Sequence, residues 1–396
     1  MGPIVYLDHL ASTPADPRVV EAMQPWLSER FGHPASKSHR FGWEAEEAIE
    51  AARALVADLL RVEPREIVFT SGGTEADNLA VKGVAEGYAA RGRHIVTTAV
   101  ENRPVLDSCR WLEETRQFAV TRVPCSFTAR VSAANVAAAL RADTILVCVQ
   151  AANQETGTCQ PIAEIGTACA ARDVLLHVDA THAAGWLDLD PRRDGVHLMS
   201  LSGNKLGGPK GIGALFVRRK DPRVRLAPLF HGGSHERGLR AGTVDVAGAV
   251  GLGRAAAIVR ETRDVEASRV RGLRDRFEAA VLERVTGSRV HGDREYRLPN
   301  VTNLSFDGCE AESLLMGMPD VAATSGAGCT SAMLEPSHVF EAMGLTRDVA
   351  AESVRFSLGR PTTSDEIDLA IERVVAGVAK VRSLDASARG GSPKKR

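Results

Sequence analysis

One lysine in this chain lies in a setting that suits covalent chemistry. Lys205 follows the apolar residues 198–201 closely, within the small-residue and glycine-rich segment 202–211. A strand that ends in a polar turn places an ammonium group at the mouth of an α/β sheet, where partial desolvation favours the neutral, nucleophilic amine. Such an amine can form a Schiff base with an aldehyde cofactor. Taken alone, the segment also fits an ordinary surface lysine, so its meaning depends on the rest of the chain.

Two further segments supply the groups that a phosphorylated aldehyde cofactor needs. Residues 175–179 read as a short apolar strand that ends in Asp179, and a carboxylate there can pair with the protonated pyridine nitrogen of pyridoxal 5'-phosphate (PLP). Residues 67–70 give another strand pattern, which continues through Gly73 and Thr74 into a helical stretch. Backbone N–H groups at such a turn bind phosphate. The three elements together predict a PLP site.

The elements that must position these groups alternate along the chain. Short β-branched runs alternate with helical stretches such as residues 43–60 and 133–140, which predicts an α/β fold with a mainly parallel sheet between helices. We expect this large PLP-binding domain to cover residues 15–256. Residues 1–14 and 257–385 are expected to form a smaller α+β domain, and residues 386–396 a disordered tail, because they are polar and rich in helix breakers. The predicted strands of the large domain lie at residues 67–70, 94–98, 144–147, 174–176, 198–199 and 213–217.

Several longer motifs resemble those of one enzyme family over nearly all of residues 4–380. The chain is similar to the cysteine desulfurases of the housekeeping iron–sulfur type, which belong to the class V aminotransferase group of fold-type I PLP enzymes. The resemblance implies conversion of L-cysteine to L-alanine by a homodimer, with the sulfur passed to an acceptor protein. The motifs are residues 6–9 (YLDH), 40–48 (RFGWEAEEA), 69–75 (FTSGGTE), 232–243 (GGSHERGLRAGT), 324–331 (TSGAGCTS), 335–339 (EPSHV) and 355–360 (RFSLGR).

The cysteines fit this family better than a disulfide or zinc protein. Seven cysteines are scattered along the chain without a C-x-x-C pair, which argues against a disulfide framework or a structural zinc site. Cys329 differs from the others because Gly326 and Gly328 predict a loop around it, and a thiol on a loop can change position. The resemblance implies that Cys329 attacks the sulfur of PLP-bound cysteine and becomes a persulfide.

Substrate and cofactor contacts are implied at further positions. Arg355 is expected to hold the substrate carboxylate, because a guanidinium group binds carboxylates through two parallel hydrogen bonds; alternation around it predicts a strand with Val354 and Phe356 on the other face. The resemblance implies that Thr243 reaches the cofactor phosphate across the dimer interface. It also implies that Asn153 lies near the cofactor phenol oxygen, although an asparagine that caps a loop is the alternative.

Four positions depart from the family pattern. Relatives carry a histidine over the pyridine ring where this chain has Asn102, whose carboxamide does not titrate and cannot be a general base. His182 stands where relatives have a glutamine against the phenol oxygen. Asn204 replaces the histidine before the Schiff-base lysine, so the phosphate cup, which includes Ser202, gains an amide donor. His33 replaces an asparagine near the substrate carboxylate, which predicts a changed substrate scope.

These departures leave three functions open. His182 can take over proton handling from position 102, because imidazole titrates near neutral pH, and desulfuration then persists. Alternatively, the pocket serves a PLP-dependent C–S lyase reaction on a cysteine-like or S-substituted substrate. In a simple lyase, Cys329 would have little reason to match the desulfurase pattern. A third reading is a silenced desulfurase paralogue that acts as a partner or scaffold; retained Lys205, Asp179 and Cys329 argue against it. The acceptor is open too: an iron–sulfur scaffold, a tRNA-thiolation protein or a dedicated carrier.

Composition and charge exclude some classes of partner. The chain has 396 residues, 44% of them hydrophobic, and a net charge of −1, so it can bury a large core and has no overall bias toward nucleic acid or acidic membranes. The first residues lack a basic leader, and no apolar run is long enough to span a bilayer. We therefore expect a cytoplasmic enzyme without a metal centre.

Overall fold

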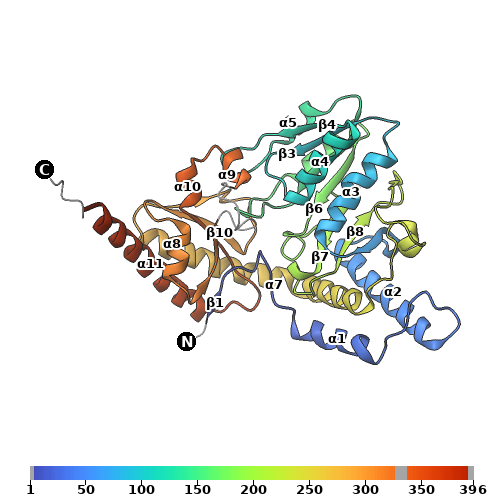
Figure 1. Ribbon diagram of the computed structural model, residues 1–396, viewed down its shortest axis with the longest axis horizontal. Helices are drawn as coiled ribbons and strands as arrows, with labels where there is room; N and C mark the ends of the chain where they lie inside the picture. Colours follow the sequence, from blue (N-terminus) through green and yellow to red (C-terminus); the bar gives the residue numbers. More distant parts are fainter. Residues whose placement is uncertain (1–3, 326–336, 391–396) are drawn as a thin grey trace.

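The large sheet of the protein gathers strands from residues 67–217. In the computed structural model, which describes residues 4–325 and 337–390, seven strands follow the order β2-β8-β7-β6-β5-β3-β4 (Figure 1). Strand β8 is antiparallel to both of its neighbours, and all other pairs are parallel, which confirms the predicted α/β class. The strands are β2 (Ile67–Thr70), β3 (His94–Thr98), β4 (Ala119–Val123), β5 (Thr144–Gln150), β6 (Leu175–Asp179), β7 (Leu198–Ser202) and β8 (Gly213–Val217).

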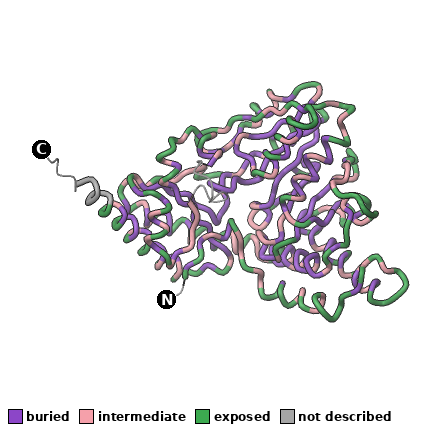
Figure 2. Tube along the Cα trace, viewed as in Figure 1, coloured by how far each residue is buried: buried purple, intermediate pink, exposed green. Residues whose placement is uncertain are grey.

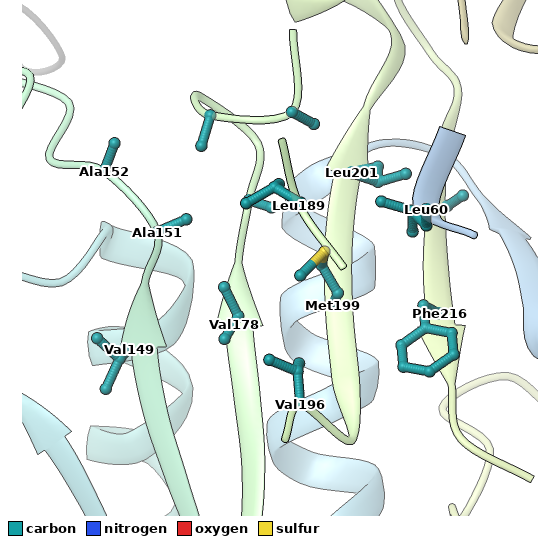
Figure 3. Close-up of a cluster of buried hydrophobic side chains, with 14 of the residues drawn as sticks. Leu60, Val149, Ala151, Ala152, Val178, Leu189, Val196, Met199, Leu201 and Phe216 are labelled. Carbon is teal, nitrogen blue, oxygen red and sulfur yellow. The ribbon is translucent and has the colours of Figure 1, made fainter. Parts of the chain in front are cut away.

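Helices cover both faces of this sheet. Within β7, Leu198 packs toward one face and Met199 toward the other, as the twofold side-chain period of a strand requires. Leu198 joins a core with α3 (Gly73–Gly87) and α4 (Arg103–Arg116). Met199 joins the larger core, with Phe216 and Leu60 (Figure 3). Five helices contribute to this core: α1 (Pro17–Ser28), α2 (Arg40–Leu60), α5 (Ala133–Ala139), α6 (Ile162–Ala170) and α7 (Val246–Arg284). Because both faces are covered, the strands other than the edge strand β4 are buried along almost their whole length (Figure 2).

A second, smaller core lies at the other end of the molecule. A four-stranded antiparallel sheet of order β12-β13-β10-β9 is accompanied by the short parallel pair β1–β11. Its strands are β1 (Val5–Tyr6), β9 (Ser288–His291), β10 (Val301–Phe306), β11 (Val321–Ala322), β12 (Thr324–Ser325) and β13 (Ser353–Ser357). Helices α8 (Ala311–Gly317) and α11 (Ser364–Gly390) pack into this core, whereas α9 (His338–Ala342) and α10 (Arg347–Ala351) contribute buried residues to the larger core.

Helices α7 and α11 extend across the predicted boundaries of the domains and of the tail. Helix α7 runs without a break from the large core, which Leu252 joins, into the small core, which Phe277 joins (Figure 1). The predicted domain boundary at residues 256/257 therefore falls inside a continuous helix, and it stays a prediction. Helix α11 ends at Gly390, beyond residue 386, where the sequence predicts a disordered tail; two alanines in residues 386–388 favour the helix.

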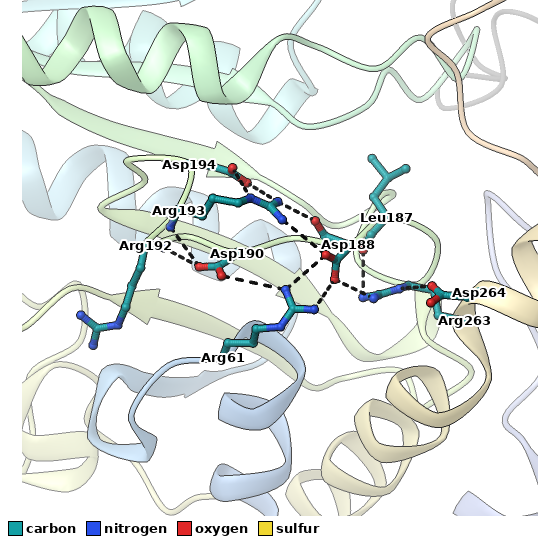
Figure 4. A network of polar contacts seen from close by, with 9 residues as sticks. All are labelled: Arg61, Leu187, Asp188, Asp190, Arg192, Arg193, Asp194, Arg263 and Asp264. Carbon is teal, nitrogen blue, oxygen red and sulfur yellow. Dashed lines mark hydrogen bonds and ion pairs between the residues drawn. The ribbon is translucent and has the colours of Figure 1, made fainter.

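An ion-pair network fixes the segment that follows β6. Asp188 accepts hydrogen bonds from Arg61 at 2.7 Å and from Arg263 at 2.6 Å, and Arg193 lies 3.3 Å from it (Figure 4). Arg61 caps the end of α2, and Arg263 lies on α7. Exposed ion pairs contribute little singly, but several that share one carboxylate hold three elements together.

Candidate active site

A cavity of about 500 Å³ opens at the carboxyl ends of the strands of the large sheet. Turns after β2, β3, β6 and β7 line it, as expected for a ligand site in an α/β sheet, and the volume is typical of small-molecule pockets. A strand of the smaller sheet, β13, contributes one further side chain, Arg355. The cavity brings together these predicted residues: Gly73, Thr74, Asn102, His182, Ser202, Asn204, Lys205 and Arg355.

The phosphate-binding part of the cavity is the start of α3. A Cβ on Gly73 would lie 2.5 Å from Thr181 Cγ2, so only glycine allows this turn to pack against the loop after β6. The turn precedes a helix whose first N–H groups point toward an anion. Ser202 donates a hydrogen bond of 2.8 Å to Asn204 Oδ1, which leaves the Asn204 amide nitrogen as the group that can donate to a phosphate. These groups line the part of the cavity where the sequence predicts a phosphate cup.

Asp179 lies at the end of β6 and carries two hydrogen bonds. Its Oδ1 accepts from the Thr181 backbone N–H at 2.9 Å, and its Oδ2 accepts from Asn102 Nδ2 at 3.1 Å. Burial, with the neighbouring Asp77, raises the pKa of Asp179. Asn102, which was expected to lie over a cofactor ring, therefore also orients the carboxylate beneath it.

A second buried carboxyl group, which the sequence reasoning missed, is Asp77, which is among the residues that line the cavity, whereas Asp179 is not. Asp77 projects from α3 and is fully buried, and neither of its oxygens has a hydrogen-bond partner among the described residues. His177 Nε2 lies 3.4 Å from Asp77 and 2.9 Å from the Ser200 hydroxyl. Burial raises the pKa of Asp77 to about 7 and lowers the pKa of His177.

The hydrogen bonds decide which carboxyl group holds the negative charge. Two buried carboxylates this close cannot both ionise readily, and the one with donors is favoured as the anion. Asp179 accepts two hydrogen bonds, at 2.9 and 3.1 Å, whereas Asp77 has only the neighbouring Ser200 hydroxyl and His177 at 3.4 Å, so the charge is favoured on Asp179 and the proton on Asp77. A polar residue among apolar neighbours, such as Ala76 and Leu79 on α3, is the sequence signal that could have revealed this group.

Lys205 is held by a segment far away in the sequence. It ends the short 3-10 helix Gly203–Lys205 after β7, and its Nζ donates to the Leu10 carbonyl at 2.7 Å and to the Ala11 carbonyl. His182 lines the same cavity. Burial, and then the charges of Lys205 and Arg355, lower the pKa of His182, so its imidazole is neutral at neutral pH.

Arg355 points into the cavity from the smaller sheet. On β13, Val354 and Phe356 pack into the small core and Arg355 faces the other way, which confirms the predicted alternation. Its Nη1 donates to the Gln154 carbonyl at 2.9 Å and its Nη2 to Asp8 Oδ1 at 3.0 Å. Its Nε is buried without a partner among the described residues. A donor of this kind can serve a substrate carboxylate.

Four predicted residues are not among those that line this cavity: Asp179, Asn153, His33 and Thr243. Asn153 is buried beside it, with Oδ1 accepting from the Glu155 and Thr156 backbone N–H groups, so the structure shows the loop-capping alternative. The next residue, Gln154, lines the cavity instead, and its Oε1 is buried without a partner among the described residues. His33 and Thr243 are exposed, outside the lining residues and bonded to each other at 3.1 Å, so His33 does not approach Arg355 in its own chain. Cys329 lies outside the described residues.

The donor set fits PLP. An amine at Lys205 and a carboxylate at Asp179 match an aldehyde and a pyridine nitrogen, and the start of α3 with Ser202 matches a phosphate. The buried, unpartnered Gln154 Oε1 borders the same space. Within residues 4–325 and 337–390 there is no cluster of histidine, cysteine and acidic side chains that could hold a metal ion. No helix in this part of the chain is long and apolar enough to cross a membrane.

Known proteins match the chain over almost its whole length. The aminotransferase class-V family matches residues 5–369. A cysteine desulfurase IscS from Escherichia coli (strain K12 / DH10B) is 49% identical over 382 residues, which are 96% of this chain and 94% of the relative. A NifS-like protein superimposes with a TM-score of 0.88 at 33% identity, covering 95% of this chain and all of that one. The structure of SspA in complex with cysteine gives a TM-score of 0.80 at 34% identity, covering 90% and 99%.

Proposed function

We propose that this chain, which belongs to the aminotransferase class-V family and is a PLP-dependent cysteine desulfurase of the housekeeping iron–sulfur type, works through Lys205, Asp179, Arg355 and Cys329. L-cysteine is its substrate. The reaction turns cysteine and one enzyme thiol into alanine and one enzyme persulfide. A C–S bond breaks while an S–S bond and a C–H bond form. The observation that carries these assignments is a cavity lined by both Lys205 and Arg355, with Asn102 in the same lining bonded to Asp179.

The substrate is oriented by Arg355. Its buried Nε donor has no protein partner among the described residues, while Asp8 and the Gln154 carbonyl hold the rest of the guanidinium in place. A fixed carboxylate restricts rotation of the bound cysteine, which aligns the bond that must break. When bound, PLP supplies an aldehyde for the substrate amine and an electron-accepting ring.

Protons are handled by Lys205, Asp179 and His182. Lys205 takes the proton from the substrate α-carbon, since its amine is the basic group held at the strand end. Asp179 stays ionised and pairs with the protonated pyridine nitrogen, because Asn102 and Thr181 donate to it. His182 is neutral and takes the proton-handling part that Asn102 cannot perform, because a carboxamide does not titrate.

Sulfur is removed by Cys329. Its thiolate attacks the substrate sulfur, so that the S–S bond forms as the C–S bond breaks and the β-carbon takes up a proton. The persulfide then passes to an acceptor protein with a thiol of its own. We place the enzyme in the cytoplasm, a location that the free cysteines among the described residues support, because thiols stay reduced there.

The active unit is a homodimer in which His33 and Thr243 enter the partner's cavity. In one chain the two residues are paired at the surface, away from the chain's own cavity. Phe31 and Phe41 stack nearby at 5.3 Å while 72% and 51% exposed. Exposed aromatic side chains beside polar groups indicate a protein interface.

Product analysis tests this function. The purified PLP-loaded protein is incubated with L-cysteine from mildly acidic to mildly alkaline pH, with Cys329→Ala alongside. We expect alanine from the wild type and loss of alanine formation in the variant. Pyruvate and free sulfide that persist in Cys329→Ala would contradict the assignment and indicate a C–S lyase.

A further inference from the structure

A second, smaller cavity lies behind Lys205. Its volume is about 30 Å³, and its lining includes Lys205, His182, His9, Thr13 and Asn300. A water molecule needs about 10–15 Å³ of such space, so the lining residues surround a site for water. All of them therefore border one small space.

Two buried polar atoms belong to residues that line this space. His182 Nδ1 and Asn300 Oδ1 have no hydrogen-bond partner among the described residues. Asn300 is 1% exposed, and its Nδ2 is already used by the Leu358 carbonyl at 3.1 Å. Buried polar groups are almost always satisfied by protein or by ordered water. The small cavity is the place where one water can satisfy both.

On the other side, His9 and Thr13 separate the small cavity from an outer groove. This groove has a volume of about 490 Å³, and its lining includes Tyr6, Lys210 and Glu366. His9 and Thr13 line both spaces, and His9 Nδ1 lies 2.7 Å from Thr13 Oγ1. The two side chains thus form a polar connection between the groove and the small cavity.

His9 packs against Gly359 and the Tyr6 ring. A Cβ on Gly359 would lie 2.4 Å from His9 Nδ1, and the Tyr6 ring meets His9 edge-on at 4.9 Å. Burial lowers the pKa of His9 to about 4, more than the charges of Glu366 and Asp8 raise it. Lys205, Arg360 and Lys210 are the lysine and arginine side chains that share a cavity lining with His9. A neutral imidazole accepts a proton at one nitrogen and donates from the other.

We propose that His9, Thr13 and one water in the small cavity form a proton route from the outer groove to Lys205 and His182. Only protons move along it, and no bond to carbon or sulfur changes there. The route rests on the proposed function, in which Lys205 accepts and releases protons in each turnover. The small cavity and the main cavity both have Leu10, His182 and Lys205 in their linings, so Lys205 borders both spaces.

His9→Phe in the PLP-loaded enzyme tests the route, with His197→Phe as the matched control. Phenylalanine keeps a ring in place but has no nitrogen to pass a proton. His197 is also buried, its pKa is lowered to about 4, and its Nδ1 also makes one hydrogen bond, from the Leu176 N–H at 3.0 Å. It precedes β7, whereas Lys205 follows that strand. We expect kcat about tenfold lower in His9→Phe with KM for cysteine unchanged, and a control near wild type.

Two further measurements separate a relay from a packing role. Imidazole added to His9→Ala should restore turnover, because the outer groove admits a small ring, and Thr13→Val should lower kcat without changing folding. A crystal structure of the loaded wild type should show a water bonded to His182 Nδ1 and Asn300 Oδ1. Equal kcat in His9→Phe and the control, absence of rescue, or a dry cavity would overturn the route. A wild type that makes no alanine would refute the proposed function as well.

Discussion

Replacing Arg355 with lysine measures how strongly the cavity holds the substrate carboxylate. Lysine keeps the positive charge but loses the planar guanidinium group. In that group the Nη atoms donate to Asp8 and the Gln154 carbonyl, and Nε has no partner among the described residues and can donate to the substrate. The variant loses one charge-assisted hydrogen bond to the substrate, which contributes about 1.5–3 kcal/mol. Since about 1.4 kcal/mol corresponds to a factor of ten, kcat/KM for L-cysteine should fall by about 10- to 150-fold.

The assay follows alanine from L-cysteine and, in parallel, turnover of cysteine methyl ester, which has no carboxylate. Arg355→Lys should lower kcat/KM for cysteine much more than for the ester. Arg274→Lys is the matched control, because Arg274 is also buried and also donates to backbone carbonyls, those of Leu298 and Val301. Equal losses on acid and ester, or an unchanged kcat/KM for cysteine, would refute the assignment of Arg355.

Three further predictions concern charge, stability and assembly. The pKa of Asp77 is raised from 3.8 to about 7 by burial, so its stabilising contribution is complete at low pH and is lost as pH rises through about 7. The Tm of Asp77→Asn minus the Tm of the wild-type apoprotein at the same pH should therefore increase between about pH 4 and about pH 8. A difference that stays constant over this range would show that Asp77 does not titrate. Glu236→Gln should lower the free energy of unfolding in urea by about 3–5 kcal/mol, because it breaks a buried ion pair with Arg53 at 2.7 Å; a loss below about 1 kcal/mol would contradict this. A hybrid dimer of Thr243→Ala with Lys205→Ala should be active, because one cavity then receives Lys205 from its own chain and Thr243 from the other; an inactive hybrid would place Thr243 in its own chain's site.

Local sequence patterns predicted the large sheet and much of the cavity. A buried strand followed by a polar turn is visible in the sequence, and the carboxyl ends of neighbouring parallel strands meet at one edge of a sheet. For this reason Gly73 and Lys205 were expected together, the family resemblance implied Asn102 and His182 beside them, and all four line one cavity. The Arg355 strand was predicted in the same way, from alternation of apolar and polar residues.

Such local patterns could not predict contacts between segments that are far apart in the sequence. No local signal links the Leu10 carbonyl to Lys205, because 195 residues separate them. Within the loop after β5, a shift of one residue decides whether Asn153 or Gln154 faces the cavity, and periodicity does not apply in a turn. Asp77 was missed because its burial becomes visible only when α3 packs on the sheet.

Two of the altered positions in the pocket, 102 and 182, have a physical role in this account. Asn102 bonds Asp179 and so helps keep the negative charge there rather than on Asp77. His182 is neutral, and its Nδ1 faces no protein partner among the described residues. An imidazole in this state can accept a proton on one side while the other side bonds to water. The changes therefore fit a desulfurase whose proton handling has moved from position 102 to position 182.

One single-turnover measurement tests the central claim most directly. The PLP-loaded enzyme is mixed with less than one equivalent of L-cysteine, and alanine and the mass of the Cys329 peptide are measured together. The account predicts that each alanine formed is matched by one added sulfur atom on that peptide. Alanine without added sulfur on Cys329, or sulfur on another cysteine, would contradict it.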